Sequence, residues 1–141
     1  MPLIRLLYYS ENRIGIARRH STIADLKAVS VKRNRESEVT GALLYDDEWF
    51  VQTLEGQERA VEETLQRIMK DPRHANVEVV VRKQIPERKF GHWAMGFAER
   101  TPETQAYFGH HWFSDTLNPF DMSEVDMLEL MERLGKEGFL R

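Results

Sequence analysis

Three polar side chains stand where this chain could bind a hydrogen-bonding ligand. Gln52 lies between Phe50 and Leu54 in a stretch that alternates like a β-strand, so all three side chains point to one apolar face. A buried primary amide must find partners, because leaving it unsatisfied costs about 1–3 kcal/mol. Tyr8 lies on an apolar face of an earlier predicted strand, and Asn34 lies at the end of the first predicted helix. The pattern indicates either a ligand site or, more simply, a glutamine that ties down a loop backbone.

Motifs of common catalytic and nucleotide-binding sites are missing. The sequence has no Gly-x-Gly-x-x-Gly, no phosphate-binding loop, no nucleophile elbow and no His-Glu-x-x-His. It has no cysteine, which excludes disulfides, thiolate metal sites and cysteine nucleophiles. The histidines lack metal-ligand spacing, and we interpret each as a surface or capping residue: His20, His74, His92, His110 and His111. The sequence therefore predicts no metal site.

The composition is that of an ordinary globular chain. Of its 141 residues, 41% are hydrophobic and 30% are charged, with a formal net charge of -3. This charge gives no bulk basic character for binding nucleic acid or an acidic membrane. The first residues lack the apolar core of a signal peptide, and no apolar run approaches transmembrane length. We expect a cytoplasmic protein that binds neither nucleic acid nor membrane.

Apolar patterning predicts the elements of the first hundred residues. The polar turn at 46–48 joins two strands into a hairpin. Thr22 and Asp25 resemble a capping box at the start of the first helix, and Gly56 is expected to end the hairpin's second strand. The expected elements are a strand over 3–9, a loop over 11–20, a helix over 22–35, a hairpin over 39–56, a helix over 61–69, and strands over 77–81 and 93–97.

This order of elements predicts an α+β, ferredoxin-like fold, a five-stranded mixed sheet with two helices on one face. Strands one and three are central neighbours in that topology. Tyr8, Asn34 and Gln52 can therefore converge on one slot between the helices and the sheet. A boundary is expected near residue 100, dividing the chain into a domain over 1–100 and a helical extension over 101–141.

The extension should contain two helices. The first is expected to begin at 101–103, and a turn is expected at 118–119. The last should start at Ser123, with Asp126 completing a capping box, and should end at Gly135 and Gly138. With so little apolar surface of its own, the extension must pack on the sheet or on a partner.

Several motifs recur at spacings that belong together. They are Leu-Leu-Tyr-Tyr-Ser at 6–10, Arg-Asn through Val-Thr-Gly at 33–41, Phe-Val-Gln-Thr-Leu-Glu-Gly at 50–56, a segment with Asp-Pro-Arg at 67–74, and Phe-Gly-His-Trp-Ala-Met at 90–95. In these motifs the chain resembles the BLUF family, the blue-light sensors that use flavin. It departs from the common family pattern at Arg33, where a second asparagine is frequent, and at Ala94, where a serine is common.

The resemblance implies a role for each matched residue. It assigns Tyr8 as the signalling tyrosine, Gln52 as the switching glutamine and Asn34 as the flavin-binding asparagine. Trp93 and Met95 match the tryptophan and methionine of strand five, and the resemblance leaves open which of them lies nearer the flavin. The further flavin contacts that it implies are Leu26, Leu54, Arg67 and Asp71.

The resemblance also implies a mechanism. Blue light drives electron and proton transfer from the tyrosine to the flavin, the glutamine rotates or tautomerises, and a reversible red-shifted state follows. The implied cofactor is FAD, with FMN and riboflavin as alternatives. No enzymatic activity is implied; the signal would pass through strand five and the C-terminal helices to a separate effector protein, in a homo-oligomer.

Two functions from other classes stay open on the residues alone. One is a small enzyme on a ferredoxin-like fold, such as a cofactor-free monooxygenase or an acylphosphatase. The other is a regulatory module that binds a metabolite without photochemistry. The fold cannot separate them from a photoreceptor, because this architecture hosts many functions.

Overall fold

The computed structural model describes residues 2–15, 18–107 and 123–141. In chain order the elements are β1 (Leu3–Asn12), α1 (Arg19–Ser37), β2 (Thr40–Tyr45), β3 (Trp49–Gln57), α2 (Glu58–Lys70), β4 (His74–Ile85), β5 (Gly96–Glu99) and α4 (Glu124–Lys136). Residues 105–107 are helical. The continuation of the helix predicted from 101–103 and the turn predicted at 118–119 lie outside the described residues.

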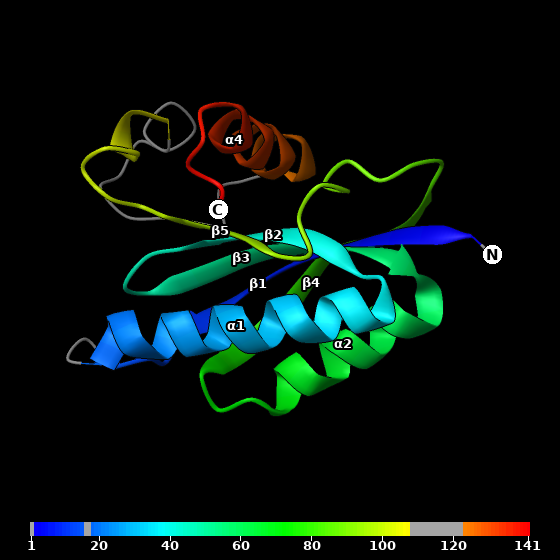
Figure 1. The fold of residues 1–141 in the computed structure, drawn as a ribbon, viewed down its shortest axis with the longest axis horizontal. Coiled ribbons are helices and arrows are strands. Elements are labelled where there is room, and N and C mark those ends of the chain that lie inside the picture. The colour runs from blue at the N-terminus through cyan, green and yellow to red at the C-terminus, as the bar shows by residue number, and fades with distance from the viewer. Residues whose placement is uncertain (1, 16–17, 108–122) are drawn as a thin grey trace.

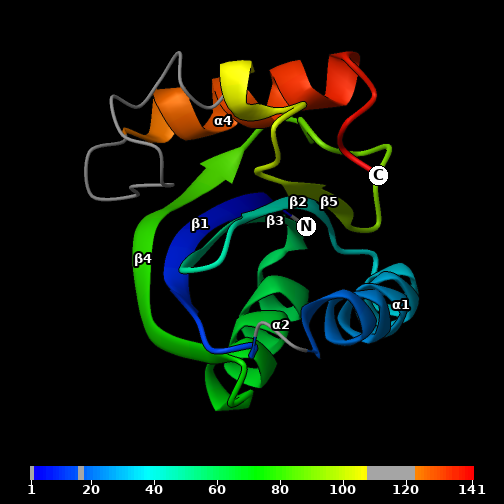
Figure 2. The ribbon, with the colours of Figure 1, turned by 90° about the vertical axis from the view of Figure 1, so that its left-hand side faces the viewer.

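The strands form one sheet in the order β4-β1-β3-β2-β5. Neighbouring strands are antiparallel except β2 and β5, which run parallel. α1 and α2 cover one face and α4 covers the other (Figures 1 and 2). The predicted ferredoxin-like fold is therefore confirmed. No helix in the described part of the chain is long and apolar enough to cross a membrane.

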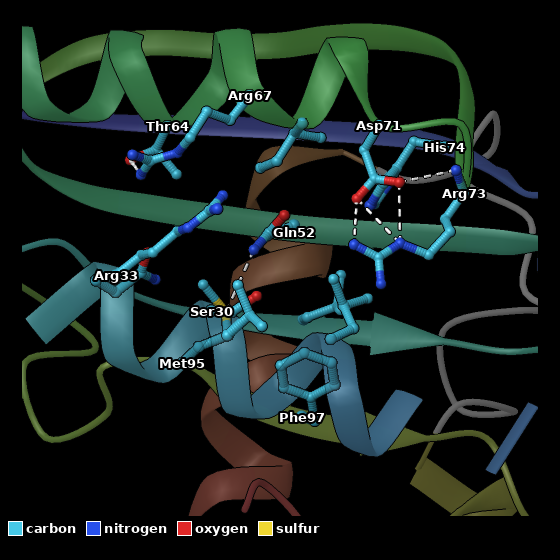
Figure 3. A pocket seen from close by; sticks show the side chains of 15 residues that line it. Ser30, Arg33, Gln52, Thr64, Arg67, Asp71, Arg73, His74, Met95 and Phe97 are labelled. Carbon is cyan, nitrogen blue, oxygen red and sulfur yellow. Dashed lines mark hydrogen bonds and ion pairs between the residues drawn. The ribbon is translucent and has the colours of Figure 1, made fainter. Parts of the chain in front are cut away.

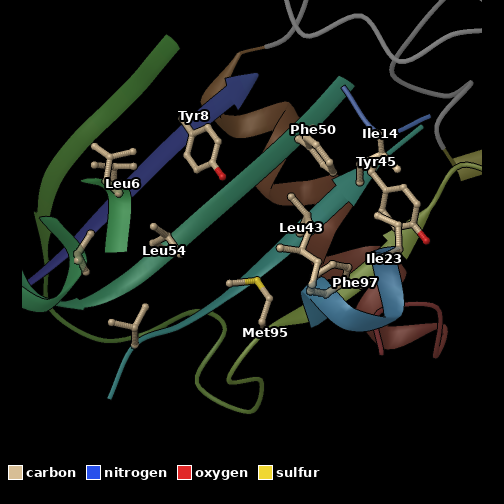
Figure 4. Close-up of a cluster of buried hydrophobic side chains, with 14 of the residues drawn as sticks. Leu6, Tyr8, Ile14, Ile23, Leu43, Tyr45, Phe50, Leu54, Met95 and Phe97 are labelled. Atoms are coloured by element: carbon tan, nitrogen blue, oxygen red, sulfur yellow. The ribbon is translucent and has the colours of Figure 1, made fainter. Parts of the chain in front are cut away.

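Strand alternation divides the core between the two faces of the sheet. Leu6, Tyr8, Phe50 and Leu54 belong to the cluster under α1 and α2, which we call the helix-side core (Figure 4). The intervening residues of the central strands face α4 and form the second cluster. Its members include Leu7, Val51, Met127, Leu130, Met131 and Leu134. Side chains two apart thus share a face, as the sequence pattern predicts.

The start of α4 also follows the sequence pattern. The backbone N of Asp126 donates to Ser123 Oγ (3.2 Å), and the backbone N of Ser123 donates to Asp126 Oδ2 (3.5 Å). This reciprocal pair is the predicted capping box. The helix runs through Gly135 to Lys136, and Gly138 takes a left-handed conformation (φ 80°) just after it. The division into two domains at residue 100 stays a prediction.

Two predicted helix and loop boundaries are wrong. α1 begins at Arg19 and not at Thr22, because Arg18, whose backbone N donates to Gly15 O (3.1 Å), leads directly into the helix. β1 continues to Asn12, within the predicted loop. The Asn12 side chain holds this strand end by donating from Nδ2 to Asp46 O (2.8 Å).

Two predicted strand ends are also wrong, because pairing with a neighbouring strand continues past each of them. Gly56 does not end β3, because it pairs with Ile4 of β1 and the ladder continues to Gln57. β4 extends from His74 to Ile85, well beyond the β-branched stretch, because β1 pairs along most of its length. Ladder partners from distant sequence thus determine where these strands stop.

Candidate functional site

A cleft opens between α1 and α2, with the sheet as its floor (Figure 3). Its empty volume is about 580 Å³, counting the space at its open mouth. Leu26 and Asn34 line it from α1, Ile68 from α2, and Gln52 and Met95 from the sheet side. Its lining combines apolar side chains with a few polar ones, as is typical of small-molecule and cofactor sites.

Three of the predicted residues form a hydrogen-bonded chain, of which Gln52 and Met95 line the cleft and Tyr8 does not. The Tyr8 hydroxyl donates to Gln52 Oε1, and Gln52 Nε2 donates to Met95 Sδ (3.3 Å). Tyr8 is fully buried and Gln52 is 5% exposed. Tyr8 and Gln52 meet because they stand directly opposite each other on β1 and β3. We call Tyr8, Gln52 and Met95 the relay.

The environment of Tyr8 keeps its phenol protonated. Burial raises its pKa well above the ordinary value, and the negative charge of Asp71 raises it further. The protonated phenol faces Gln52 Oε1, and because an amide oxygen can only accept, the phenol is the donor in this hydrogen bond. This assignment directs the amide nitrogen of Gln52 toward Met95.

Asn34 brings an amide to the edge of the cleft from the last turns of α1. It is 3% exposed, and its Nδ2 donates to the backbone O of Ala94 (2.7 Å). Among the described residues the amide has no other partner, so one N–H and the carbonyl oxygen remain for a ligand. Asn34 also ties α1 to the segment that leads into β5.

The mouth of the cleft is basic. It is an open pocket that shares Arg33, Arg67, Asp71 and Arg73 with the cleft and adds Lys70. The positive charge of Arg73 is compensated by Asp71 in an ion pair, with Arg73 Nη2 2.5 Å from Asp71 Oδ2. Burial alone raises the pKa of Asp71, but the hydrogen bonds and charge of Arg73 outweigh it and lower the pKa overall. Arg33, Arg67 and Lys70 have no ion-pair partner within the described ranges, so the mouth favours an anion.

His74 is a cleft residue that sequence reasoning missed. It was expected at the surface or at a cap, but it is 8% exposed and lines the cleft. Its Nδ1 lies 2.9 Å from Ser10 Oγ, and its ring lies 4.4 Å from the ring of Phe50. Burial lowers its pKa to about 4, with the charge of Arg73 adding to the decrease and that of Asp71 opposing it. His74 is therefore neutral at physiological pH.

The lowered pKa of His74 predicts a loss of stability in acid. A histidine titrates at about 6.5 in the unfolded chain and at about 4 here, so the unfolded state binds more protons between these values. The contribution of His74 to the free energy of unfolding should be fully present above about pH 6.5. The free energy of unfolding should then decline by up to about 3 kcal/mol as the pH falls toward 4. Urea unfolding across this range measures the decline. His74→Gln should flatten it and His92→Gln, at an exposed position, should not; an equally steep decline in His74→Gln would contradict the assignment.

Trp93 lies away from the cleft. β5 begins at Gly96, so the segment before it is outside the ladder and its side chains do not alternate. Trp93 packs against the second cluster, which faces α4, and a Cβ added to Gly135 would lie 2.9 Å from the indole ring. The strand predicted over 93–97 would place Trp93 and Met95 on one face, and this is wrong, because the two side chains pack in different clusters. Met95 is the residue beside Gln52.

The remaining predicted residues divide between cleft and core. Leu26, Arg67 and Asp71 line the cleft. Leu54 is fully buried in the helix-side core and does not line it. Ser30 and Thr64 complete the polar lining, but no sequence signal marked them because each has the pattern of a helix-surface residue.

The cleft suits a flat, largely apolar ring with a polar edge and an anionic tail. Leu26, Ile68 and Phe97 offer apolar surface, while Asn34 and Gln52 offer amides. The isoalloxazine ring of a flavin has this character, and the basic mouth suits a phosphate. In the part of the chain that the structure describes, no group of three or more histidine or acidic side chains could hold a metal ion.

Comparison with known proteins agrees with this geometry. The family model BLUF, described as sensors of blue-light using FAD, matches residues 3–96. The chain belongs to the BLUF family. A relative is the blue light- and temperature-regulated antirepressor BluF of Escherichia coli (strain K12), 38% identical over 69 residues, which are 49% of this chain and 17% of that protein. Another is the photoactivated adenylate cyclase subunit alpha of Euglena gracilis, 38% identical over 89 residues, which are 63% of this chain and 8% of that protein.

Solved structures extend the likeness beyond residue 96. The photo-activated state of BlsA superposes with a TM-score of 0.81 at 26% identity and covers 94% of each chain. BlrB, a BLUF protein in its dark state, gives 0.77 at 30% identity and covers 93% of this chain and 97% of its own. The chain spans less than a fifth of either curated relative. The BLUF domain is a flavin-binding blue-light sensor, and this decides against both alternative functions as the role of the domain.

Proposed function

We propose that light acts on this protein through the relay. The supporting observation is the continuous chain of contacts from a protonated phenol, through an amide, to a thioether at the floor of the cleft. A flavin bound there supplies absorption of blue light and a reversible acceptor for one electron and one proton. Tyr8 gives up both and takes both back once the amide has rotated, so the covalent structure is unchanged and an altered hydrogen-bond network is what persists in the lit state.

Loss of the phenolic proton reverses the role of Gln52 in its hydrogen bond with Tyr8, because Gln52 must then donate and no longer accept. With Tyr8 as donor, Oε1 accepts and Nε2 is directed to Met95. Once the tyrosine oxygen can only accept, rotation of the amide places Nε2 on that oxygen and Oε1 toward the sulfur, which has no hydrogen to donate. Met95 loses its hydrogen-bond donor, and the segment leading into β5 loses one of its restraints.

Asn34 is proposed to hold the flavin edge. We expect Asn34→Ala to weaken flavin binding about tenfold, because one or two hydrogen bonds to the ligand are lost. Flavin retained after purification, measured by absorbance per protein, tests this placement. Asn12→Ala is the comparison, since Asn12 is also a buried amide but holds a loop beyond the cleft. Equal flavin retention in the two variants would contradict the assignment.

The cofactor is proposed to be a phosphorylated flavin, FAD or FMN. Arg33, Arg67 and Lys70 give the cleft mouth unpaired positive charge, and Arg33 stands where the family often has an amide. Arg33→Gln should weaken binding of FMN about fivefold and leave riboflavin unchanged, because only the phosphate meets this charge. Titration of flavin-depleted protein with each flavin measures the two affinities. Arg59→Gln, an exposed change on α2, is the control; equal losses for both flavins would exclude a phosphate contact.

We propose that this chain passes on the light signal by contacting another protein, and that it catalyses no reaction itself. The relatives are named as an antirepressor and as cyclase subunits, so related domains occur in proteins with very different outputs. α4 packs on the sheet through Met127 and Leu130 and presents its other side outward. We propose a separate effector and a homo-oligomer, which light scattering of dark and illuminated samples would test.

A further inference from the structure

Residues that follow α4 close the outer edge of β5. β5 is the last strand of the sheet, so its outer edge would otherwise present unpaired backbone groups. Phe97 N donates to Arg141 O (2.8 Å), and Arg141 N donates to Phe97 O (3.0 Å). Such a reciprocal pair is typical of antiparallel strands. Figure 1 shows this segment between β5 and α4, and we call residues 139–141 the closing segment.

Leu140 of the closing segment fits a site made by two glycines and an indole. Leu140 is 4% exposed, and a Cβ added to Gly96 would lie 2.7 Å from its Cγ. A Cβ added to Gly135 would lie 2.9 Å from the ring of Trp93 and 3.7 Å from Leu140. We call the space bounded by Trp93, Gly96 and Gly135 the leucine seat. It has no room for a side chain at either glycine.

The leucine seat adjoins the relay. Met95, whose sulfur accepts from Gln52, is bonded directly to Gly96. A backbone shift at residue 95 therefore moves one wall of the seat. The part of the β5 edge that is open to pairing is also short, because the backbone O of Glu99, the last residue of β5, already accepts from Thr104 Oγ1 (2.7 Å). Only a segment of a few residues can pair there.

We propose that the β5 edge is a docking surface for a short extended segment of a partner protein, and that the closing segment covers it until the relay changes. The closing segment defines the chemistry of the occupant. Its backbone pairs with Phe97 and a leucine-like side chain enters the leucine seat, which is strand addition with one specificity pocket. The trigger, which is the release of the closing segment when the relay changes, rests on the proposed function. The closed contact, which is the pairing of the closing segment with β5 in the dark, does not.

Hydrogen exchange of the Arg141 amide, read by NMR on the full chain in the dark, tests the closed contact. Gly96→Ala should raise its exchange rate at least about tenfold, because the added Cβ occupies the leucine seat. Gly91→Ala is the matched control, since its Cβ would meet only Arg88 at 3.6 Å. Leu140→Ala should act like Gly96→Ala with less risk to folding. Unchanged exchange in Leu140→Ala would overturn the proposal.

A labelled peptide with the sequence of residues 137–141, Glu-Gly-Phe-Leu-Arg, probes docking. It should bind Leu140→Ala about tenfold more tightly than the unchanged chain, because the leucine seat is then open, and Glu-Gly-Phe-Ala-Arg should bind neither. Equal affinity of the two peptides would overturn the docking surface. In illuminated samples, a flavin spectral shift without a gain in peptide affinity would overturn the trigger alone. A missing spectral shift would count against the proposed function, while the dark comparison still decides the surface.

Discussion

Replacing Tyr8 with phenylalanine is expected to leave flavin bound and to abolish the light-driven spectral shift. Tyr8 contacts Gln52 and does not line the cleft, so its hydroxyl is not needed to hold the ring. Phenylalanine cannot release a proton, and it leaves Gln52 Oε1 without its donor. The reversible response should fall from full amplitude to none, as measured by absorbance before and after blue light.

Tyr9→Phe is the matched control for this result. Tyr9 is the next residue of β1, but it faces the opposite side of the sheet, where its ring lies 6.0 Å from that of Trp49. Its loss should leave the spectral shift intact. A full photocycle in Tyr8→Phe would remove Tyr8 from its assigned role. Loss of the shift in both variants would indicate damage to the sheet instead.

Substitution of Gln52 by leucine should have an equally large effect. Leucine is close in size and suits an apolar face, but it removes both hydrogen bonds of the relay. The fully buried Tyr8 hydroxyl is then left without an acceptor, which should lower the free energy of unfolding by about 1–3 kcal/mol. Flavin should remain bound, and the spectral shift should be absent.

Urea unfolding and the light response together separate the two consequences of this change. Gln57→Leu, at the exposed end of β3, makes the same chemical substitution outside the relay and should affect neither measurement. A Gln52→Leu protein that still shifts its spectrum would show that the amide is not the switching group. A stability loss with a normal photocycle would leave Gln52 as a structural residue only.

Much of the relay could be predicted from the sequence because it lies in regular strands. Tyr8 and Gln52 each follow a two-residue alternation, and the ferredoxin-like order makes their strands neighbours. The start of α4 could be predicted for a similar reason, since Ser123 and Asp126 form a contact within one helical turn. Local periodicity and short-range contacts carry this information.

The errors fall where contacts between distant segments decide the structure. Trp93 was placed with Met95 by assuming that β5 starts early, but its pairing with β2 begins only at Gly96. His74 is buried by Ser10 and Phe50, which come from two other strands. No pattern near these residues in the sequence reveals such packing.

The central claim is that a flavin in the cleft reports a light-driven change in the relay. The direct measurement is the visible absorption spectrum of the purified protein in the dark, after blue light, and during dark recovery. Flavin bands that shift to the red and then return are the predicted result, with the shift lost in Tyr8→Phe. A protein that stays colourless after reconstitution with excess flavin, or whose bound flavin does not respond to light, would contradict the account.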